Sequence, residues 1–198
     1  SIWPWSDVVS NFEKFSSQSV NNKKLFEIGC GAGANIPYFL SKGLDYHGCD
    51  LSKTIVDYTN KRFSLNKRII RKNFLDVNPK INYYDFIVDR ASVTHNYRTD
   101  IIKIIEAVHL QLKKNGKFFG IDWYSTKCSD FKKSKNRNKI KKFRSGNFKS
   151  LGNVYFSNYK DMKFFFKKFK ILKLEEKIYT SPKSNSVHAS WIIVVEKK

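Results

Sequence analysis

The chain has 198 residues, of which 41% are hydrophobic and 16% aromatic, and 38 Lys and Arg residues against 17 Asp and Glu residues give a formal net charge of +21. This much apolar material excludes a disordered chain and supplies one core, so we expect a single domain over residues 1–198. No apolar run approaches the about 20 residues of a membrane-spanning helix, and the first residues show no signal-peptide pattern. Three scattered cysteines lack the paired spacing of a zinc site, which favours a reducing cytoplasmic compartment and predicts no metal.

Short apolar runs alternate with amphipathic stretches, a pattern typical of an α/β domain with a parallel sheet. An N-terminal helical segment is predicted within residues 1–20. The strands predicted next, in chain order, are Leu25–Ile28, Tyr46–Cys49, Arg68–Arg71, a strand that ends at Phe86–Val88, and Lys117–Trp123. The helices between them are predicted at Asn35–Lys42, at Lys53–Phe63 and along the apolar face from Ile101 to Leu112, with Asn115-Gly116 closing the last helix.

A basic stretch interrupts this pattern after the fifth strand, and we expect an insertion or lid over residues 124–157. Residues 127–149 contain ten basic residues and one acid, Asp130. A solvated loop or helix and a mobile lid over an anionic substrate both fit this composition. A helix is predicted at Asn158–Phe166, followed by strands at Ile171–Thr180 and Ser190–Glu196 that are antiparallel because their connection is short.

Three glycines follow the first strand in the run LFEIGCGAGAN at residues 25–35. Glycines allow a tight turn and a close approach of the backbone to a ligand, and the helix start behind them offers free N–H groups. Asp50 ends the second strand, where an acid accepts two ribose hydroxyls. A dinucleotide site remains possible on Gly29, Gly31 and Ala34, but Glu27 repels a pyrophosphate and favours a ligand that carries ammonium and sulfonium groups.

The pattern Glu27-x-Gly29-x-Gly31-x-Gly33 resembles motif I of the class I S-adenosylmethionine-dependent methyltransferases. Asp50 within GCDLS is similar to the ribose-binding acid of that family, and YDFIVDR at 84–90 is similar to its fourth strand. KNGKF at 114–118 resembles the turn before its fifth strand. The resemblance covers residues 22–123.

This resemblance implies a Rossmann-like α/β fold with a seven-stranded, mostly parallel sheet in the order 3-2-1-4-5-7-6, the last strand antiparallel, and helices on both faces. It also implies an enzyme that uses S-adenosylmethionine and releases S-adenosylhomocysteine. The cofactor contacts that it implies are Glu27, Gly29, Cys30, Gly31, Gly33, Asp50, Leu51, Asn73, Phe74, Asp76, Asp89 and Arg90. Asn73 and Asp76 are alternatives for the contact with the adenine amino group, and Asp89 is expected at the amino end of the cofactor.

His95 is the candidate general base, because it lies in the loop after strand four, which borders the methyl group in the family, and imidazole titrates near neutral pH. A structural role, as a helix cap or a contact to the cofactor backbone, is the alternative for this residue.

The acceptor is less constrained by the sequence. No Asp/Asn-Pro-Pro-Tyr signature of amino-group nucleic-acid methyltransferases follows strand four. We therefore expect methyl transfer to a hydroxyl of a small molecule or saccharide. An RNA or DNA methyltransferase that uses the basic surface is the first alternative, although 31 of the 38 basic residues are lysines, and a genome biased toward A and T codons explains such a composition equally well. A non-catalytic regulatory or assembly subunit that binds S-adenosylmethionine is the second. The aromatic residues considered as walls of an acceptor pocket are Trp3, Trp5, Tyr97, Trp123 and Tyr124.

Overall fold

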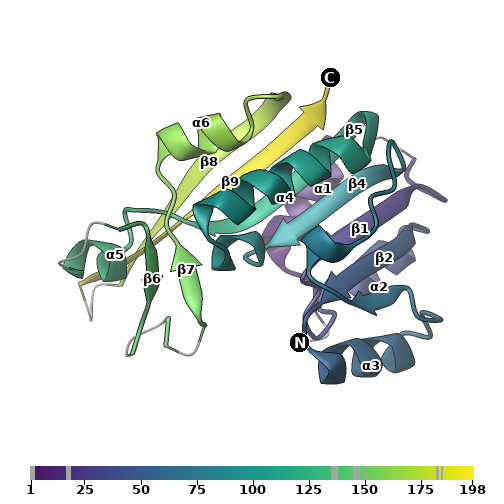
Figure 1. Cartoon of the computed structure of the whole chain (residues 1–198), viewed down its shortest axis with the longest axis horizontal. Helices are drawn as coiled ribbons and strands as arrows, with labels where there is room; N and C mark the ends of the chain where they lie inside the picture. The colour runs from purple at the N-terminus through teal and green to yellow at the C-terminus, as the bar shows by residue number, and fades with distance from the viewer. Residues whose placement is uncertain are drawn as a thin grey trace.

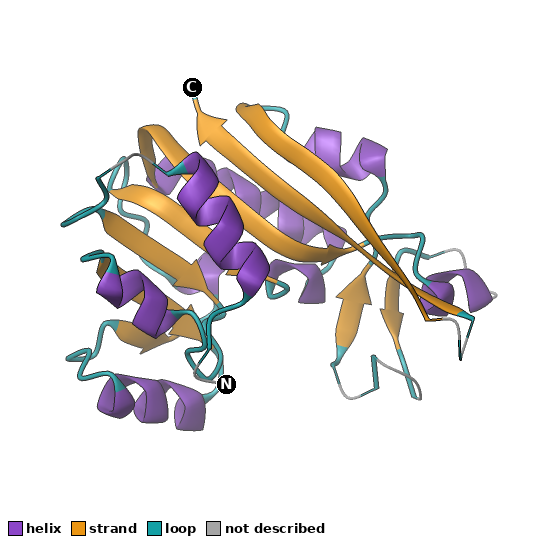
Figure 2. Ribbon diagram, turned by 180° about the vertical axis from the view of Figure 1, so that it is seen from behind, coloured by secondary structure: helices purple, strands orange, loops and turns teal. Residues whose placement is uncertain are grey.

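The computed structural model describes residues 3–16, 19–134, 138–144, 148–149, 151–181, 183 and 185–198. A seven-stranded sheet in the order β3-β2-β1-β4-β5-β9-β8 forms its centre (Figures 1 and 2). Its strands are β1 Lys24–Ile28, β2 Asp45–Asp50, β3 Ile69–Arg71, β4 Tyr84–Arg90, β5 Leu112–Tyr124, β8 Phe169–Ser181 and β9 Ser186–Lys197. The first five are parallel, and β9 is antiparallel to both β5 and β8. The predicted order is confirmed, because β6 and β7 lie outside this sheet.

Helices cover both faces of the sheet, as Figures 1 and 2 show from opposite sides. Alternate residues of β4 explain this layering: Phe86 and Val88 face one apolar core and Ile87 the other. The first core is covered by α1 Ser6–Phe15, α2 Ile36–Ser41 and α3 Lys53–Arg62. The second is covered by α4 Arg98–Gln111, α6 Tyr159–Phe165 and the short 3₁₀ helix η1 Phe74–Asp76.

The predicted end of the fourth helix was wrong. Helix α4 ends at Gln111, and β5 already begins at Leu112. Leu112 pairs with Tyr84, whereas Lys117 pairs with Phe86, so the intervening residues bulge out of the ladder. Asn115 takes φ 62° within this bulge, a left-handed conformation that asparagine tolerates. Asn115-Gly116 therefore marks an irregularity in the strand, and tertiary pairing with β4 decides where the helix stops.

The segment expected as an insertion forms a small lobe beside the far end of the β8–β9 hairpin (Figure 1). It contains α5 Ser129–Lys133 and a separate antiparallel pair, β6 Ile140–Lys142 and β7 Asn153–Tyr155. An aromatic cluster holds it together; its members include Phe131, Phe143, Phe148 and Phe156, packed against Ala189 of β9. The lid expected from the basic composition of this segment did not include these aromatic anchors. Residues 135–137, 145–147 and 150 of this segment lie outside the described residues.

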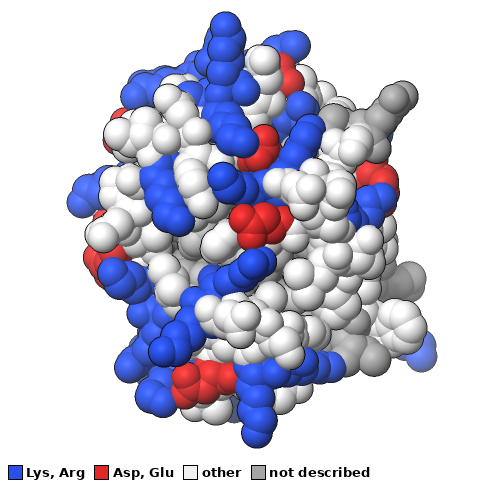
Figure 3. Space-filling view, turned by 90° about the vertical axis from the view of Figure 1, so that its right-hand side faces the viewer, with Lys and Arg blue, Asp and Glu red and all other residues white. Residues whose placement is uncertain are grey.

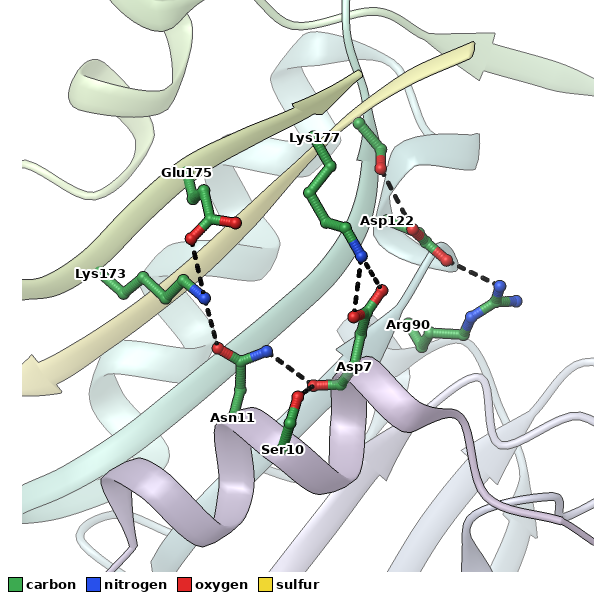
Figure 4. Close-up of polar contacts among 9 residues, drawn as sticks. Asp7, Ser10, Asn11, Arg90, Asp122, Lys173, Glu175 and Lys177 are labelled. Atoms are coloured by element: carbon green, nitrogen blue, oxygen red, sulfur yellow. Dashed lines mark hydrogen bonds and ion pairs between the residues drawn. The ribbon is translucent and has the colours of Figure 1, made fainter. Parts of the chain in front are cut away.

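Polar contacts fasten α1 across the sheet, as Figure 4 shows. Asp7 binds Lys177 of β8 at 2.7 and 2.9 Å, and Asn11 accepts a hydrogen bond from Lys173 at 3.0 Å. The neighbouring Arg90 forms an ion pair with Asp122 at 2.7 Å. These bonds join the N-terminal helix to a strand more than 160 residues later in the chain.

Candidate functional site

A cavity of about 250 Å³ opens at the carboxyl ends of the parallel strands. It lies where the strand order reverses between β1 and β4, the place at which open α/β sheets bind ligands. The sheet, the loops after β2, β3 and β4, and helix α4 all contribute to its lining. The lining residues are Ile28, Gly29, Cys49, Asp50, Leu51, Lys72, Asn73, Phe74, Ser92, His95, Asn96 and Ile104.

The glycine turn after β1 forms one wall of this cavity. Gly29 has φ 65°, and a Cβ added there would lie 2.1 Å from the hydroxyl oxygen of Ser92, so only glycine allows the turn to pass the loop after β4. Gly31 has φ 52°, and an added Cβ would meet nothing within 4 Å. The turn is therefore packed on one side and has open space on the other.

Asp50 lies at the end of β2 with its carboxylate fixed by two backbone groups. Oδ2 accepts a hydrogen bond from the Gly31 amide at 3.0 Å, and Oδ1 accepts one from the Ser52 amide at 2.9 Å. Each carboxylate oxygen retains capacity for another bond. The side chain is thus oriented, at the cavity wall, to accept from a pair of ligand hydroxyls.

The loop after β3 supplies the part of the cavity that suits a flat ring. Phe74 is buried and Asn73 half-buried, and both line the cavity, whereas Asp76 is exposed and lies outside its lining. Asn73 Oδ1 accepts a hydrogen bond from the Leu75 amide at 3.1 Å, which fixes the start of η1. Leu51 is 66% exposed on the facing loop, and burial against a ligand would remove this apolar surface from water.

His95 ends the 3₁₀ helix η2 Val93–His95 and lines the same cavity. Its Nδ1 lies 2.8 Å from the carbonyl oxygen of Asn153 on β7. A carbonyl only accepts, so Nδ1 carries the hydrogen and the neutral ring has its lone pair on Nε2. The insertion lobe thus fixes the tautomer of the candidate base, a contact between residues 58 positions apart.

Glu27, for which the motif predicts a direct contact, is not among the residues that line the cavity. Successive strand residues point to opposite faces, so Glu27 lies on the α1–α2 side while Ile28 faces the cavity. Its carboxylate is 2% exposed and accepts hydrogen bonds from Asn35 at 2.7 Å and from the Tyr46 hydroxyl at 2.5 Å. Burial raises the pKa of Glu27 to about 7. Glu27 stabilises the glycine turn through its hydrogen bond with Asn35, which follows the turn.

Asp89 and Arg90 are also not among the residues that line the cavity. Asp89 is 0% exposed and accepts hydrogen bonds from the amides of Ser92 and Val93, both at 3.0 Å, and from the Trp123 indole at 2.7 Å. Burial raises its pKa to about 7. Asp89 therefore holds the loop that carries His95.

Arg90 points to the α1 side, where its guanidinium lies 3.5 Å from the centroid of the Trp5 ring and pairs with Asp122. Both partners draw it away from the cavity lining. Of the aromatic residues considered as walls, Trp123 is fully buried in the core, and Trp5 covers Arg90.

The cavity brings together six of the thirteen predicted site residues: Gly29, Asp50, Leu51, Asn73, Phe74 and His95. It does not include Glu27, Cys30, Gly31, Gly33, Asp76, Asp89 and Arg90 among its lining residues. The lining residues that the sequence analysis missed are Ile28, Cys49, Lys72, Ser92, Asn96 and Ile104. Each lies next to a predicted site residue or in the loop of His95, except Ile104, which only the packing of α4 brings to the site.

The lining suits a nucleoside-type ligand: a carboxylate for paired hydroxyls at Asp50, apolar surface for a ring at Phe74 and Leu51, and open space beside Gly31. Within the described part of the chain, no group of three or more His, Cys, Asp or Glu side chains is placed to hold a metal ion. No helix among the described residues combines the length and hydropathy that a membrane span requires.

Comparison with known proteins gives a consistent result. A family model described as a methyltransferase domain matches residues 25–116. A phosphoethanolamine N-methyltransferase from Plasmodium falciparum is 30% identical over 108 residues, which are 53% of this chain and 41% of that protein. The chain therefore spans less than half the length of this curated relative.

Two solved structures share the fold. A methyltransferase dependent on S-adenosylmethionine from Methanosarcina mazei has a TM-score of 0.76 and 16% identity, covering 98% of both chains. The phosphoethanolamine N-methyltransferase 2 of Haemonchus contortus, in complex with phosphomonomethylethanolamine and S-adenosylhomocysteine, has a TM-score of 0.70 and 16% identity. That match covers 100% of this chain and 54% of the other. At such identities the likeness concerns the arrangement of the chain in space.

Proposed function

We propose that this chain, a member of the class I S-adenosylmethionine-dependent methyltransferase family, binds S-adenosylmethionine in the cavity at the carboxyl edge of its sheet and transfers the methyl group to a small molecule or saccharide. The observation that carries this proposal is the convergence of Gly29, Asp50, Phe74 and His95 on that one cavity. They come from the ends of β1, β2, β3 and β4, four strands that are consecutive neighbours in the sheet around the switch point.

The residues that would hold the cofactor divide its parts among them. Asp50 would accept hydrogen bonds from the ribose hydroxyls, Asn73 would contact the edge of the adenine, and Phe74 and Leu51 would flank the adenine ring. The turn at Gly29, which has no side chain, would allow the cofactor to approach the protein backbone. When bound, the cofactor supplies a methyl group activated by its sulfonium. The protein's task is then to position an acceptor and to remove its proton.

His95 is the group that we propose to take this proton. Its Nδ1 donates to Asn153, so Nε2 is the basic atom. The acceptor hydroxyl or amine gives its proton to Nε2 as its oxygen or nitrogen gains the methyl group, and S-adenosylhomocysteine leaves. Asp89 supports this step indirectly, because it fixes the amides at the start of the His95 loop.

A small acceptor is favoured by the volume of the cavity, about 250 Å³, and by the names of the relatives. Both phosphoethanolamine methyltransferases act, by name, on a small molecule. A hydroxyl remains the acceptor that we infer from the presence of a base. An amine that arrives protonated needs the same proton removal, so His95 serves either acceptor.

The cofactor site is tested by replacing Asp50. Asp50→Ala removes two charge-assisted hydrogen bonds to the ribose and should weaken S-adenosylmethionine binding about 10–100-fold by calorimetry. Asp76→Ala is the matched control, because this exposed acid outside the cavity should leave the affinity unchanged. Equal affinities for wild type and Asp50→Ala would contradict the assignment.

The base is tested by His95→Gln, measured with an acceptor identified from a panel of small hydroxyl and amine compounds. Turnover should fall by about 10²–10⁴-fold while cofactor affinity stays unchanged. His109→Gln is the control, since His109 packs against Phe169 on the far side of α4. Turnover of His95→Gln within a few-fold of wild type would eliminate His95 as the base.

A further inference from the structure

A second cavity lies between the start of α4 and the β6–β7 pair of the insertion lobe. Its volume is about 490 Å³, and it is separate from the cofactor cavity. The two are neighbours along the chain, because residues 92, 95 and 96 line the first and residues 97–99 line the second. The lining residues are Tyr97, Arg98, Thr99, Asn138, Lys139, Ile140 and Tyr155.

Tyr155 presents to this cavity a hydroxyl whose proton has no acceptor. The residue is 3% exposed, its hydroxyl has no partner at hydrogen-bond geometry within the described residues, and the side chain that interacts with it, Arg98, can only donate. Burial raises the pKa of Tyr155 to about 12, although the nearby Arg98 lowers it, so the phenol stays protonated at neutral pH. A buried hydroxyl without a partner costs about 1–3 kcal/mol. A ligand oxygen in the cavity would supply the missing partner.

Arg98 supplies a positive charge that no carboxylate of the described residues pairs with. Its guanidinium lies 4.7 Å from the ring centroid of Phe164 and 5.7 Å from that of Phe165. This stacking holds the guanidinium in place and leaves it N–H donors beyond its contact with the Tyr155 hydroxyl. Lys139 differs, because Asp161 forms an ion pair with it. The charge available to a ligand in this cavity is therefore that of Arg98.

The N-terminus of α4 adds to this field. The amides of Asp100 and Ile101 bond to the Tyr97 carbonyl, whereas the first amides of a helix lack partners within the helix and carry partial positive charge. Helix α4 has 14 residues, enough for a full macrodipole at Arg98 and Thr99. A guanidinium, an unsatisfied phenol and a helix N-terminus form a donor set that matches a compact oxyanion.

We propose that this cavity binds the anionic group of the methyl acceptor, a phosphate monoester or a similar compact oxyanion, so that the proposed function acts on an anionic small molecule. Strand β7 connects the two cavities: Asn153 orients His95, and Tyr155 lies two residues further along the same strand. This inference about the acceptor rests on the proposed function, but the anion site itself does not.

The test uses inorganic phosphate as the probe, titrated into the full chain by calorimetry at constant ionic strength. Wild type should bind phosphate saturably. Arg98→Gln should weaken binding at least about tenfold, and Tyr155→Phe, which removes only the hydroxyl, should weaken it several-fold. Arg62→Gln is the matched control: it removes the same charge from exposed α3, where Arg62 contacts Tyr58, and should change nothing.

Each outcome separates the anion site from the cofactor site. Absence of saturable phosphate binding in wild type, or equal losses in Arg98→Gln and Arg62→Gln, overturns the anion site even if S-adenosylmethionine binds. If Arg98→Gln proves unstable, an unchanged phosphate affinity in Tyr155→Phe overturns it instead. Saturable phosphate binding that is lost in both site variants supports it, and failure of wild type to bind S-adenosylmethionine then counts against the proposed function alone.

Discussion

Glu27 and Asp89 are the two buried acids that hold the loops of the site from behind. Glu27 is bonded by Asn35 and Tyr46, and Asp89 by two amides and an indole. Burial raises the pKa of both to about 7. A buried carboxylate carries a desolvation cost that its hydrogen bonds offset only in part. At both positions the carboxylate accepts the hydrogen bonds that hold the neighbouring loop.

The raised pKa of Glu27 predicts a pH-dependent stability. Its pKa is 4.5 in an ordinary environment and about 7 in the fold, so between these values the folded state holds more protons than the unfolded state. The free energy of unfolding therefore falls as pH rises through this window and stays low above it. Asp89 contributes with the same sign.

Glu27→Gln removes this titration while an amide still offers one acceptor and one donor to Asn35 and Tyr46. Denaturant unfolding should show that the free energy of unfolding of the wild type is lower at pH 8 than at pH 5. In Glu27→Gln this decrease should be smaller by about 1–3 kcal/mol. Asp76→Asn, which replaces an exposed acid, should show the same decrease in the free energy of unfolding as the wild type. An equal decrease in Glu27→Gln would show that the titration of Glu27 does not cause it.

At the scale of elements, the insertion lobe has a small core of its own. Phe156 is fully buried and lies 5.3 Å from Phe131, 5.4 Å from Phe148 and 5.9 Å from Phe143, measured between ring centroids. This cluster is separate from the two cores that sandwich the sheet. The lobe is connected to the site through β7, which supplies the carbonyl bonded to His95.

Phe156→Ala should therefore loosen the lobe more than the sheet. Loss of a buried phenylalanine costs about 3–5 kcal/mol, and a separate cluster confines the effect to its own element. Hydrogen exchange should rise sharply at β6 and β7 and little at β1 and β4. Phe39→Ala, in the core beneath α1 and α2, is the matched control and should act on the sheet. Equal protection losses in both regions for Phe156→Ala would contradict an independent lobe.

At the scale of the whole molecule, the formal net charge of +21 dominates the surface. On the side away from the insertion lobe, basic side chains are far more widespread than acidic ones (Figure 3). Repulsion among like charges destabilises a compact state, and salt screens it with a Debye length of about 10 Å at 0.1 M. Exposed ion pairs are each worth about 0–1 kcal/mol, so their weakening by salt is the smaller effect.

Added salt should therefore raise the melting temperature. We expect an increase of several degrees between about 20 mM and about 300 mM sodium chloride. A variant with the exposed Lys61, Lys114 and Lys160 replaced by Gln should melt higher than wild type at low salt and gain less from added salt. A melting temperature that falls with salt in wild type would show that ion pairs, and not repulsion, control the stability.

The sequence by itself determined the alternation of strands and helices and the glycine turn with its acid, whereas the sheet order and the helices on both faces were implied by the family resemblance. Period-two and helical apolar patterns are local, and the glycine turn with Asp50 at the end of the next strand places ligand-binding groups at one sheet edge whatever the rest of the chain does. Gly29 and Asp50 were predicted for this reason, and Asn73, Phe74 and His95 were predicted from the family resemblance; all five line the cavity.

Only the tertiary structure decided which acids face the cavity and which support it. The partners that hold the carboxylate of Glu27, Asn35 and Tyr46, lie 8 and 19 residues away in the chain. Tertiary packing also decided the partner of His95, which lies 58 residues later, and it placed Arg98 and Tyr155 at the same second cavity. Such pairs leave no local pattern in the sequence, because hydrogen bonds between distant segments depend on how whole elements pack.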